Sequence, residues 1–458
     1  MKHTYDLVFA GGTVVTSGET FRTNLCVSEG KIAAWEEEIP RAARVIDCRD
    51  LIIAPGAVDM HFHIRTPGRS DREDFDSATK AAAHGGVTTL AEMPIAKPSP
   101  HNAPTLRDRA EHAKGLAIAD YAFYGAGAVM NPQTAQELAD AGVVGFKMFL
   151  HAAPKGREDE FHGLCAPTSA EVLRSLEANA RTGLLTAVHA EDDGFIRELS
   201  EKWSGERALD WRAQVESRPP EAEELAVCAV ALAARRTGAR THICHVSSKQ
   251  TAEAVQFLQA QGCPITAETC PHYLLMDVES MVKFGTLAKV NPSLRTAEHR
   301  NGLLNALKQG ALSVIASDHA PFLKGEKGAD FLKAPGGMPN IEFFGPMLWD
   351  AVHSGLWSWN DLARWTSEVP AKLLGLYPRK GHIYPGADAD IVLIDPSGSW
   401  NPSIEELYTK SRESAAPLLG KYRSRLISTY IRGVQVYDRA EGIVAERGFG
   451  TWQRPVKK

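Results

Sequence analysis

The sequence lacks the features that would assign it to a membrane or a nucleic-acid-binding class. Its 458 residues contain no uninterrupted run of 18 apolar side chains, the length that a membrane-spanning helix needs. Its 51 basic and 56 acidic side chains give a net charge of -5, which supplies no basic field for a nucleic acid. We therefore expect neither a membrane nor a nucleic acid as a partner.

Paired cysteine motifs are absent as well. The seven cysteines include no CxxC pair, which argues against a disulfide scaffold. The opening MKHTYDLVFAGGTVV has a short apolar run broken by Gly11 and Gly12, and this pattern favours a strand and a turn over a secretory signal. With 44% hydrophobic and 23% charged residues, the composition is that of a globular protein. These features predict a cytoplasmic protein.

The middle of the chain repeats a strand-like run followed by a helical segment. Between residues 56 and 365 there are eight such units, most with a glycine where the helix should end. In the helical segment 168–183, Thr168 and Glu171 have the spacing of a capping box. Alternating strands and helices imply parallel strands, and eight units predict a (β/α)8 TIM barrel. An open doubly wound sheet is the alternative, but no GxGxxG follows the first strand.

The two ends of the chain have a different pattern. Residues 1–55 contain short strand-like pieces separated by glycines and polar turns, and residues 366–458 resume this style. Each end alone is small for an independent β domain. We therefore expect both ends to pair into one small β-sandwich domain, interrupted by an α/β barrel over residues 56–365.

The segment VDMHFHIR, residues 58–65, places two histidines at the end of the first barrel strand. Residues two apart on a strand point to the same face, so His61 and His63 project together. By themselves they indicate either half of a metal site or two polar residues near a strand end.

Further polar residues occur at the ends of other predicted barrel strands. Lys147 lies toward the end of strand 4 in GFKMF, and His189 and His245 end strands 5 and 6. Asp318 ends strand 8 in ASDHAP. Each has a structural explanation alone, but active sites of such barrels form at these strand ends, so their convergence predicts one site. His242 is expected on the opposite strand face, in a structural role.

The residue types of this site indicate metal chemistry. Imidazoles and a carboxylate suit zinc or a similar divalent ion. Four histidines and one aspartate are too many ligands for one catalytic ion that keeps an open position. We therefore expect two divalent metal ions, zinc or alternatively manganese, and two such cations need an anionic bridge.

The site pattern and its flanking motifs resemble those of the amidohydrolase superfamily. More narrowly, the chain is similar to the cyclic amidohydrolases, which include hydantoinases, dihydropyrimidinases, allantoinases and dihydroorotases. The motifs that carry this resemblance cover most of the chain in order. They are APGAVDMHFHIRTPG, AAAHGGVTTLAEMP, GFKMF, HAE, CHVSS, AETCPHYL, KVNPSLR, SDHAP and PGADADIVLIDP.

The resemblance implies a specific site and reaction. It implies a carbamylated Lys147 that bridges two metals, with His61, His63 and Asp318 on one ion and His189 and His245 on the other. The expected reaction opens a cyclic amide or ureide ring by attack of a metal-bridging hydroxide. Asp318 is expected to act as general base and then to protonate the leaving nitrogen. Relatives of this kind also imply a homodimer or homotetramer.

Different residues favour different ring substrates. Arg65 and Asn291 resemble the carboxylate-binding residues of dihydroorotases, but Ile95 stands where that family usually has asparagine. No tyrosine follows Lys147 as it does in dihydropyrimidinases and D-hydantoinases, and His151 is the nearest polar side chain. Hydantoinases of the L type and allantoinases therefore remain the nearest group, with dihydroorotase as the alternative.

The sequence leaves several roles open. Arg65 is either a surface or supporting residue or one that selects an acidic ring substituent. The segment 149–167 is long enough for a mobile lid, although ordered packing against a neighbouring subunit is equally compatible. Backbone near Asn291 and Gly337 is expected to contact substrate by analogy. An inactive scaffold relative is the alternative of another class, disfavoured because no ligand position is missing.

Overall fold

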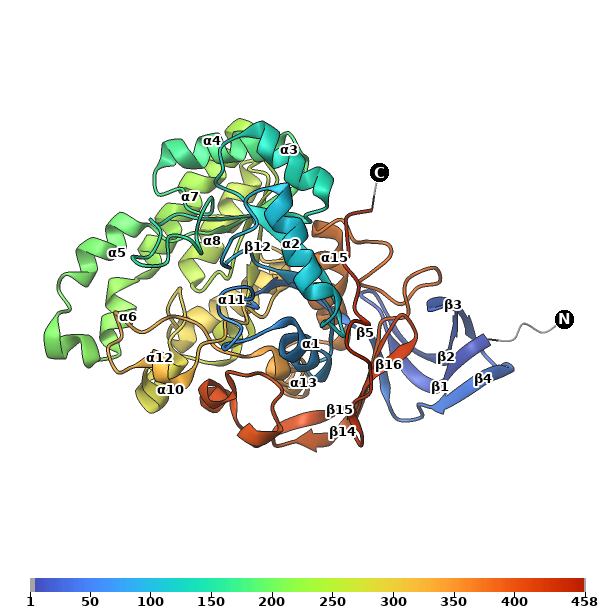
Figure 1. Ribbon diagram of the computed structural model, residues 1–458. Coiled ribbons are helices and arrows are strands. Elements are labelled where there is room, and N and C mark those ends of the chain that lie inside the picture. The colour runs from blue at the N-terminus through green and yellow to red at the C-terminus, as the bar shows by residue number, and fades with distance from the viewer. Residues whose placement is uncertain (1–4, 457–458) are drawn as a thin grey trace.

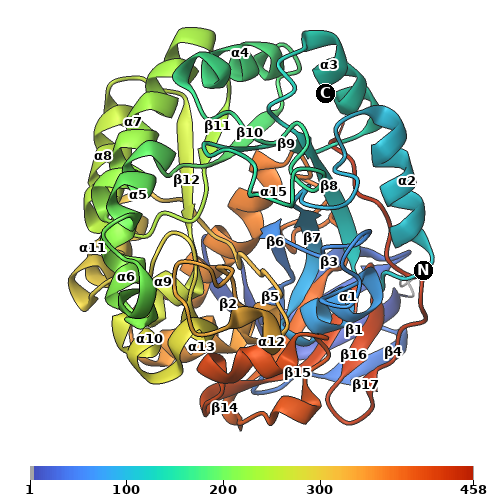
Figure 2. The same cartoon turned by 60° about the vertical axis from the view of Figure 1, so that its left-hand side comes forward.

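The barrel is the central element of the computed structural model, which describes residues 5–456. Eight parallel strands follow one another in chain order around a single sheet (Figure 2). A bridge between Phe62 and His319 joins the first strand to the segment after the last one, and the His63 N–H donates to the His319 carbonyl at 2.9 Å. The predicted barrel is confirmed. Its strands are β6 (Ala57–Phe62), β7 (Val87–Glu92), β8 (Asp120–Ala126), β9 (Gly145–Phe149), β10 (Leu185–His189), β11 (Thr241–Ile243), β12 (Ile265–Thr269) and β13 (Val314–Ile315).

Helices cover the outside of the barrel and connect its strands. Each predicted helical segment is helical in the structure, and Thr168 caps α4 by accepting from the Glu171 N–H at 3.3 Å. The connecting helices are α1 (Phe75–His84), α2 (Ala103–Lys114), α3 (Pro132–Ala141), α4 (Ser169–Ala180), α7 (Pro220–Thr237), α8 (Lys249–Ala260), α11 (Ala297–Gln309) and α13 (Phe344–His353). Shorter helices lie in the loops: α5 (Asp193–Ser200), α6 (Arg212–Ser217), α9 (Pro271–Leu275), α10 (Val278–Phe284), α12 (Lys324–Lys327) and α14 (Trp359–Ala363).

A second sheet combines strands from both ends of the chain (Figure 1). The joint is the antiparallel pair β5–β14, in which Ile53 faces Leu393. The strand expected near the start of the chain continues through Gly11 and Gly12 as one strand, β1, with an irregular register between Phe9 and Gly12 where a turn was expected. The prediction that the two ends share one β domain is confirmed. Its strands are β1 (Tyr5–Val15), β2 (Thr20–Ser28), β3 (Lys31–Glu36), β4 (Ala42–Asp47), β5 (Ile52–Pro55), β14 (Ile391–Trp400), β15 (Tyr422–Ile431), β16 (Val434–Asp438) and β17 (Gly442–Ile443).

The amino-terminal end of the barrel is closed from below by the segment after α14. Helix α15 (Val369–Leu373) and the residues after it bury Ala371, Leu374 and Leu376 among apolar side chains of the barrel interior. The boundary at residue 366 therefore places barrel-packing residues with the β domain, and the domain division stays a prediction. No helix in the described part of the chain has the length and apolar character needed to cross a membrane.

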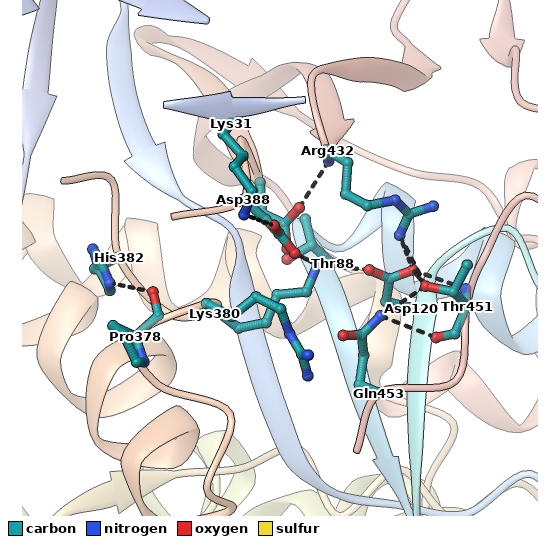
Figure 3. A network of polar contacts seen from close by, with 12 residues as sticks. Lys31, Thr88, Asp120, Pro378, Lys380, His382, Asp388, Arg432, Thr451 and Gln453 are labelled. Atoms are coloured by element: carbon teal, nitrogen blue, oxygen red, sulfur yellow. Dashed lines mark hydrogen bonds and ion pairs between the residues drawn. The ribbon is translucent and has the colours of Figure 1, made fainter. Parts of the chain in front are cut away.

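A buried polar network joins the β domain to this same end of the barrel (Figure 3). Lys380 Nζ lies 2.6 Å from Asp120 at the start of β8, 2.8 Å from Asp390 and 3.1 Å from Asp388. The Arg432 guanidinium also contacts Asp120, and Thr451 of the carboxy-terminal tail donates to it. Because the active sites of such barrels lie at the opposite end, we interpret this network as structural.

Candidate active site and metal centre

Five of the six predicted metal-site residues line one cavity of about 650 Å³ at the carboxyl ends of the barrel strands. They are His61, His63, His189, His245 and Asp318. The sixth, Lys147, is fully buried on β9. The structure thus brings together residues that are as much as 257 positions apart in the sequence, as the order of parallel strands predicted.

His61, His63 and Asp318 form the first part of the site. The Oδ1 atom of Asp318 lies 3.3 Å from His61 Nε2 and 3.5 Å from His63 Nε2. Burial is the main cause that lowers the pKa of His61 to about 4 and that of His63 well below its ordinary value. Both rings are therefore neutral near pH 7, which is the form that binds a metal. The three donor atoms converge closely enough to hold one ion.

His189 and His245 form the second part. His189 Nδ1 and His245 Nε2 face each other at 3.0 Å, and the ring of His245 lies 5.2 Å from that of His61. Burial lowers the pKa of His189 to about 4 and the pKa of His245 well below its usual range. Two neutral ring nitrogens in this position are better suited to binding a cation between them than to binding each other. The donor set therefore fits a second metal ion beside the first.

Lys147 lies between these two groups with little to balance an ammonium charge. Its Nζ is 3.0 Å from the Cys244 thiol and 5.0 Å from the centre of the Phe149 ring. Within residues 5–456 no carboxylate oxygen approaches this nitrogen within 4.0 Å. The buried Lys147 side chain therefore has a thiol as the hydrogen-bond partner of its Nζ.

Glu268 on β12 is a supporting residue that the sequence interpretation missed. Its two carboxylate oxygens lie 2.5 Å from His61 Nδ1 and 3.1 Å from His242 Nε2. Burial alone would raise the pKa of Glu268, but His61 and His242 outweigh this effect and lower it. The carboxylate fixes the His61 ring so that Nε2 points toward Asp318, a common arrangement behind metal ligands. The signal was present in the motif AETCPHYL, which ends strand 7.

His242 therefore contacts the site indirectly rather than standing apart from it. Its second ring nitrogen, Nδ1, lies 2.7 Å from the Thr266 hydroxyl, so both nitrogens have partners. The side chain is fully buried. Its Nε2 contacts the Glu268 carboxylate, and the side chain lies outside the cavity that the metal-site residues line.

Two of the site residues have a left-handed backbone, which non-glycine residues rarely adopt. The φ angle is +40° at His245 and +45° at Asp318. Strained conformations of this kind persist where the surrounding structure enforces them, and they concentrate at functional sites. Here they turn both side chains toward the cavity directly after short strands.

Comparison with known proteins agrees with this geometry. The model of the amidohydrolase family matches residues 52–436. The chain belongs to the amidohydrolase family. An allantoinase of Escherichia coli (strain K12) is 32% identical over 449 residues, which cover 97% of this chain and 98% of that protein. The family inferred from the sequence motifs is thereby confirmed.

Solved structures with the same fold support the family assignment. The L-hydantoinase (dihydropyrimidinase) from Arthrobacter aurescens superimposes with a TM-score of 0.92 at 28% identity, covering 98% of this chain and 100% of that one. A dihydropyrimidinase from Brevibacillus agri NCHU1002 has a TM-score of 0.88 at 29% identity, covering 98% of this chain and 99% of its own.

Arg65 of this amidohydrolase is not a surface residue. It is 5% exposed, lines the cavity and has a φ angle of +75°. Its guanidinium stacks on Phe322 at 5.1 Å, and neither Nε nor Nη1 has a hydrogen-bond partner. Burial, together with Arg157 and Arg72, lowers the pKa of Arg65 to about 9. A buried donor without a partner at a cavity wall is suited to a ligand anion.

The other predicted substrate contacts are less uniform. His151 is half-buried and Asn291 accepts from the Gln214 side chain at 2.9 Å, and both line the cavity. Gly337 is not among the lining residues, whereas its neighbour Gly336 is. A Cβ on Gly336 would lie 2.7 Å from Asn291 Cγ, so glycine permits this close approach.

The segment 149–167 forms one side of the cavity and is packed against the barrel. Phe149 N–H donates to the Leu164 carbonyl and the Ala166 N–H to the Phe149 carbonyl, both at 2.8 Å. Phe161 and Leu164 are buried with Ile95 and Phe149 in a small apolar cluster. The segment thus covers its own barrel, and the expectation that it moves as a lid stays a prediction.

Proposed function

We propose that this protein is a metal-dependent hydrolase that opens the ring of a cyclic amide or ureide, of the hydantoinase or allantoinase type. One observation carries the proposal: four buried imidazoles and a carboxylate line one cavity at the barrel mouth, and the buried Lys147 lies on β9 of the same barrel. The similarity to an allantoinase, an L-hydantoinase and a dihydropyrimidinase supports the same class of reaction.

The chain offers ligands for two divalent cations, zinc or alternatively manganese. His61, His63 and Asp318 would hold one, His189 and His245 the other, and Lys147, once carbamylated, would be the anionic ligand between them. When bound, such a pair supplies Lewis-acid activation of the scissile carbonyl and of the attacking water. The position of Lys147, with a thiol as the hydrogen-bond partner of its Nζ, supports reaction of its amine with CO2, which forms an N–C bond and releases a proton to give the carbamate.

The chain's own residues would then orient the ring and move protons. Asp318 is the carboxylate at the cavity floor, and its Oδ1 lies within 3.5 Å of both histidines of the first group. From this position it can take a proton from the attacking water and return it to the ring nitrogen that leaves. Glu268 and His242 hold the His61 ring in place during this exchange.

The lysine bridge is tested by Lys147→Ala. We expect the variant to lose bound metal and ring-opening activity together, as measured by metal analysis of the purified protein and by turnover. A matched control is Lys324→Ala, which removes an exposed lysine of α12 and should keep both. Full activity in a metal-free Lys147→Ala protein would refute the proposal.

A second candidate, dihydroorotase, is favoured by Arg65. Its side chain lines the cavity, two of its guanidinium nitrogens have no hydrogen-bond partner, and a guanidinium suits a carboxylate on the ring. Ile95, buried in the apolar cluster beside Phe149, offers no further donor for that carboxylate. We therefore rank neutral five-membered ureides first and dihydroorotate second.

A substrate panel separates these candidates. Protein loaded with zinc or manganese is assayed with allantoin, hydantoin, 5-substituted L- and D-hydantoins, dihydrouracil and dihydroorotate. Turnover of neutral five-membered rings supports the hydantoinase or allantoinase type, whereas turnover of dihydroorotate alone assigns Arg65 to carboxylate binding. If metal-loaded protein opens none of these rings, the result would favour the alternative that the protein is a catalytically inactive scaffold relative.

Assembly and location complete the proposal. We keep a homodimer or homotetramer as the expected assembly, to be measured by light scattering coupled to size exclusion. A cytoplasmic location is supported by the seven cysteines, none of which forms a disulfide.

A further inference from the structure

One wall of the cavity is built by the loops that follow β12 and β13. Leu332, Lys333, Ala334, Pro335 and Gly336 line it from the second loop. Lys289 and Asn291 line it from the first, directly after the short helical turn Gly285–Ala288. What holds these two loops against each other therefore determines the shape of the space in which a ring would lie.

Lys327, the last residue of α12, joins the two loops from one side. It is 1% exposed, and its Nζ donates to the carbonyls of Lys289 at 3.2 Å, Pro335 at 3.0 Å and Gly337 at 2.6 Å. Three acceptors around one nitrogen match the three N–H groups of an ammonium. One of the three belongs to the first loop and two belong to the second.

Lys289 makes the reciprocal connection from the first loop. It is 3% exposed, and its Nζ donates to the carbonyls of Phe331 and, at 2.6 Å, Ala334. The Lys289 carbonyl, which accepts from Lys327, also accepts from the Gly337 N–H at 2.9 Å. Each lysine thus binds backbone of the loop that carries the other.

Neither lysine has the partner that usually accompanies a buried cation. In the described part of the chain, no carboxylate oxygen lies within the 4.0 Å of an ion pair from either Nζ; the acidic neighbour Glu326 pairs instead with Arg69 and Arg72. Because both side-chain nitrogens donate to carbonyls of the cavity wall, their bonds define the geometry of the loops rather than a charge pair.

The wall is also fixed to the strand that carries the site carboxylate. The Ala320 N–H, two residues after Asp318, donates to the Met338 carbonyl at 3.0 Å. Gly337 has a φ angle of +143°, and a Cβ there would lie 2.6 Å from the Cβ of Ala320. A shift of residues 331–337 would therefore be transmitted to the cavity between Asn291 and Asp318.

We propose that Lys289 and Lys327, the lysine clamp, are positioning residues that fix the wall formed by residues 331–337 and so set which ring substituents fit. They act through the backbone that they bind and do not react with substrate. The part of this inference that concerns substituents depends on the proposed ring-opening function, whereas the part that concerns loop order does not.

The first test is Lys327→Met, which keeps an unbranched side chain and removes all three donors. Hydrogen–deuterium exchange should become faster at the amides of residues 331–338, most clearly at the Gly337 N–H. In turnover of the substrate panel, kcat/KM should fall roughly ten- to a hundredfold, mainly through KM, as expected for a misplaced ring. The ratio of kcat/KM between substrates with small and with bulky 5-substituents should move closer to one, while the amount of bound metal stays at the wild-type level.

Lys324→Met is the matched control, because it removes an exposed lysine three residues earlier on the same helix and should leave exchange and KM unchanged. If Lys327→Met does not fold, Lys289→Met is expected to give the same exchange pattern. Where all variants fold, the loss of kcat/KM in the double variant Lys289→Met/Lys327→Met should be smaller than the losses of the two single variants combined.

The outcomes separate the two proposals. Wild-type exchange at residues 331–338 and an unchanged KM in a folded Lys327→Met protein would overturn the clamp. If the wild type opens no ring of the panel, the proposed function fails, and the exchange experiment still decides whether the two lysines order the wall.

Discussion

Removing the charge of Lys380 should destabilise the fold more than any substitution of an exposed lysine. Lys380 and its network partners Lys31 and Arg432 carry three positive charges, and Asp120, Asp388 and Asp390 carry three negative ones. The Lys380 side chain is fully buried, and its Nζ contacts all three carboxylates, of which Asp120 and Asp388 are labelled in Figure 3. Lys380→Met keeps most of the apolar stem and leaves one uncompensated negative charge below the barrel.

The size of the effect follows from this burial. Removing one partner of a buried charge pair costs about 3–5 kcal/mol, because the remaining charge has neither water nor a counter-ion. If the 458 residues unfold as one unit, an unfolding entropy of about 1 kcal/mol/K converts this loss into a fall of about 3–5 °C in Tm. Folding in two steps would concentrate the loss in the unit that contains the network.

The assay compares Tm and the urea midpoint of wild type, Lys380→Met and Lys31→Met. Lys31 is the matched control: it pairs with Asp388 at 3.2 Å but its side chain is 53% exposed, so its loss should cost at most about 1 kcal/mol. Equal effects of the two substitutions, or a Lys380→Met protein within about 1 kcal/mol of wild type, would contradict the reasoning from burial.

Three further outcomes are expected. Burial tends to raise the pKa of Asp120, but the two cations that contact it lower this pKa overall. The charged Asp120 therefore stabilises the fold fully above about pH 4, and this contribution is lost as the pH falls further. The difference in Tm between wild type and Asp120→Asn should accordingly become smaller from pH 6 to pH 3. Glu268→Gln should weaken zinc binding about 10- to 100-fold in equilibrium dialysis because His61 loses its carboxylate partner. Glu253→Gln, at an exposed position of α8, should bind zinc like the wild type. Thr168→Ala removes the cap of α4 and should lower the free energy of unfolding by about 1 kcal/mol, as measured by urea denaturation. An unchanged free energy of unfolding would mean that the cap does not limit stability.

The barrel and the positions of the metal-site residues were predictable from local patterns. The alternation of strand-like runs and helical segments in residues 56–365 indicated the order of the parallel strands. That order places His61, His189 and Asp318 at one end, because parallel strands end on the same side of a sheet. The residues at these strand ends are of types that bind metals, and residue types are read directly from the sequence.

Contacts between distant loops could not be predicted in this way. Nothing in the local pattern indicates that Glu268 would reach both His61 and His242, that Arg65 would be buried without a partner, or that Lys327 would bind the Lys289 carbonyl. The Glu268 contacts depend on how three barrel strands face one another across the interior. The other two depend on how one loop folds against another, and loops have no periodic pattern that a sequence can reveal. By itself, the sequence therefore determined which strand ends face each other and what chemistry they share. Only the tertiary structure decided which polar groups support that site and which wall encloses it, because those contacts depend on packing across the barrel rather than along the chain.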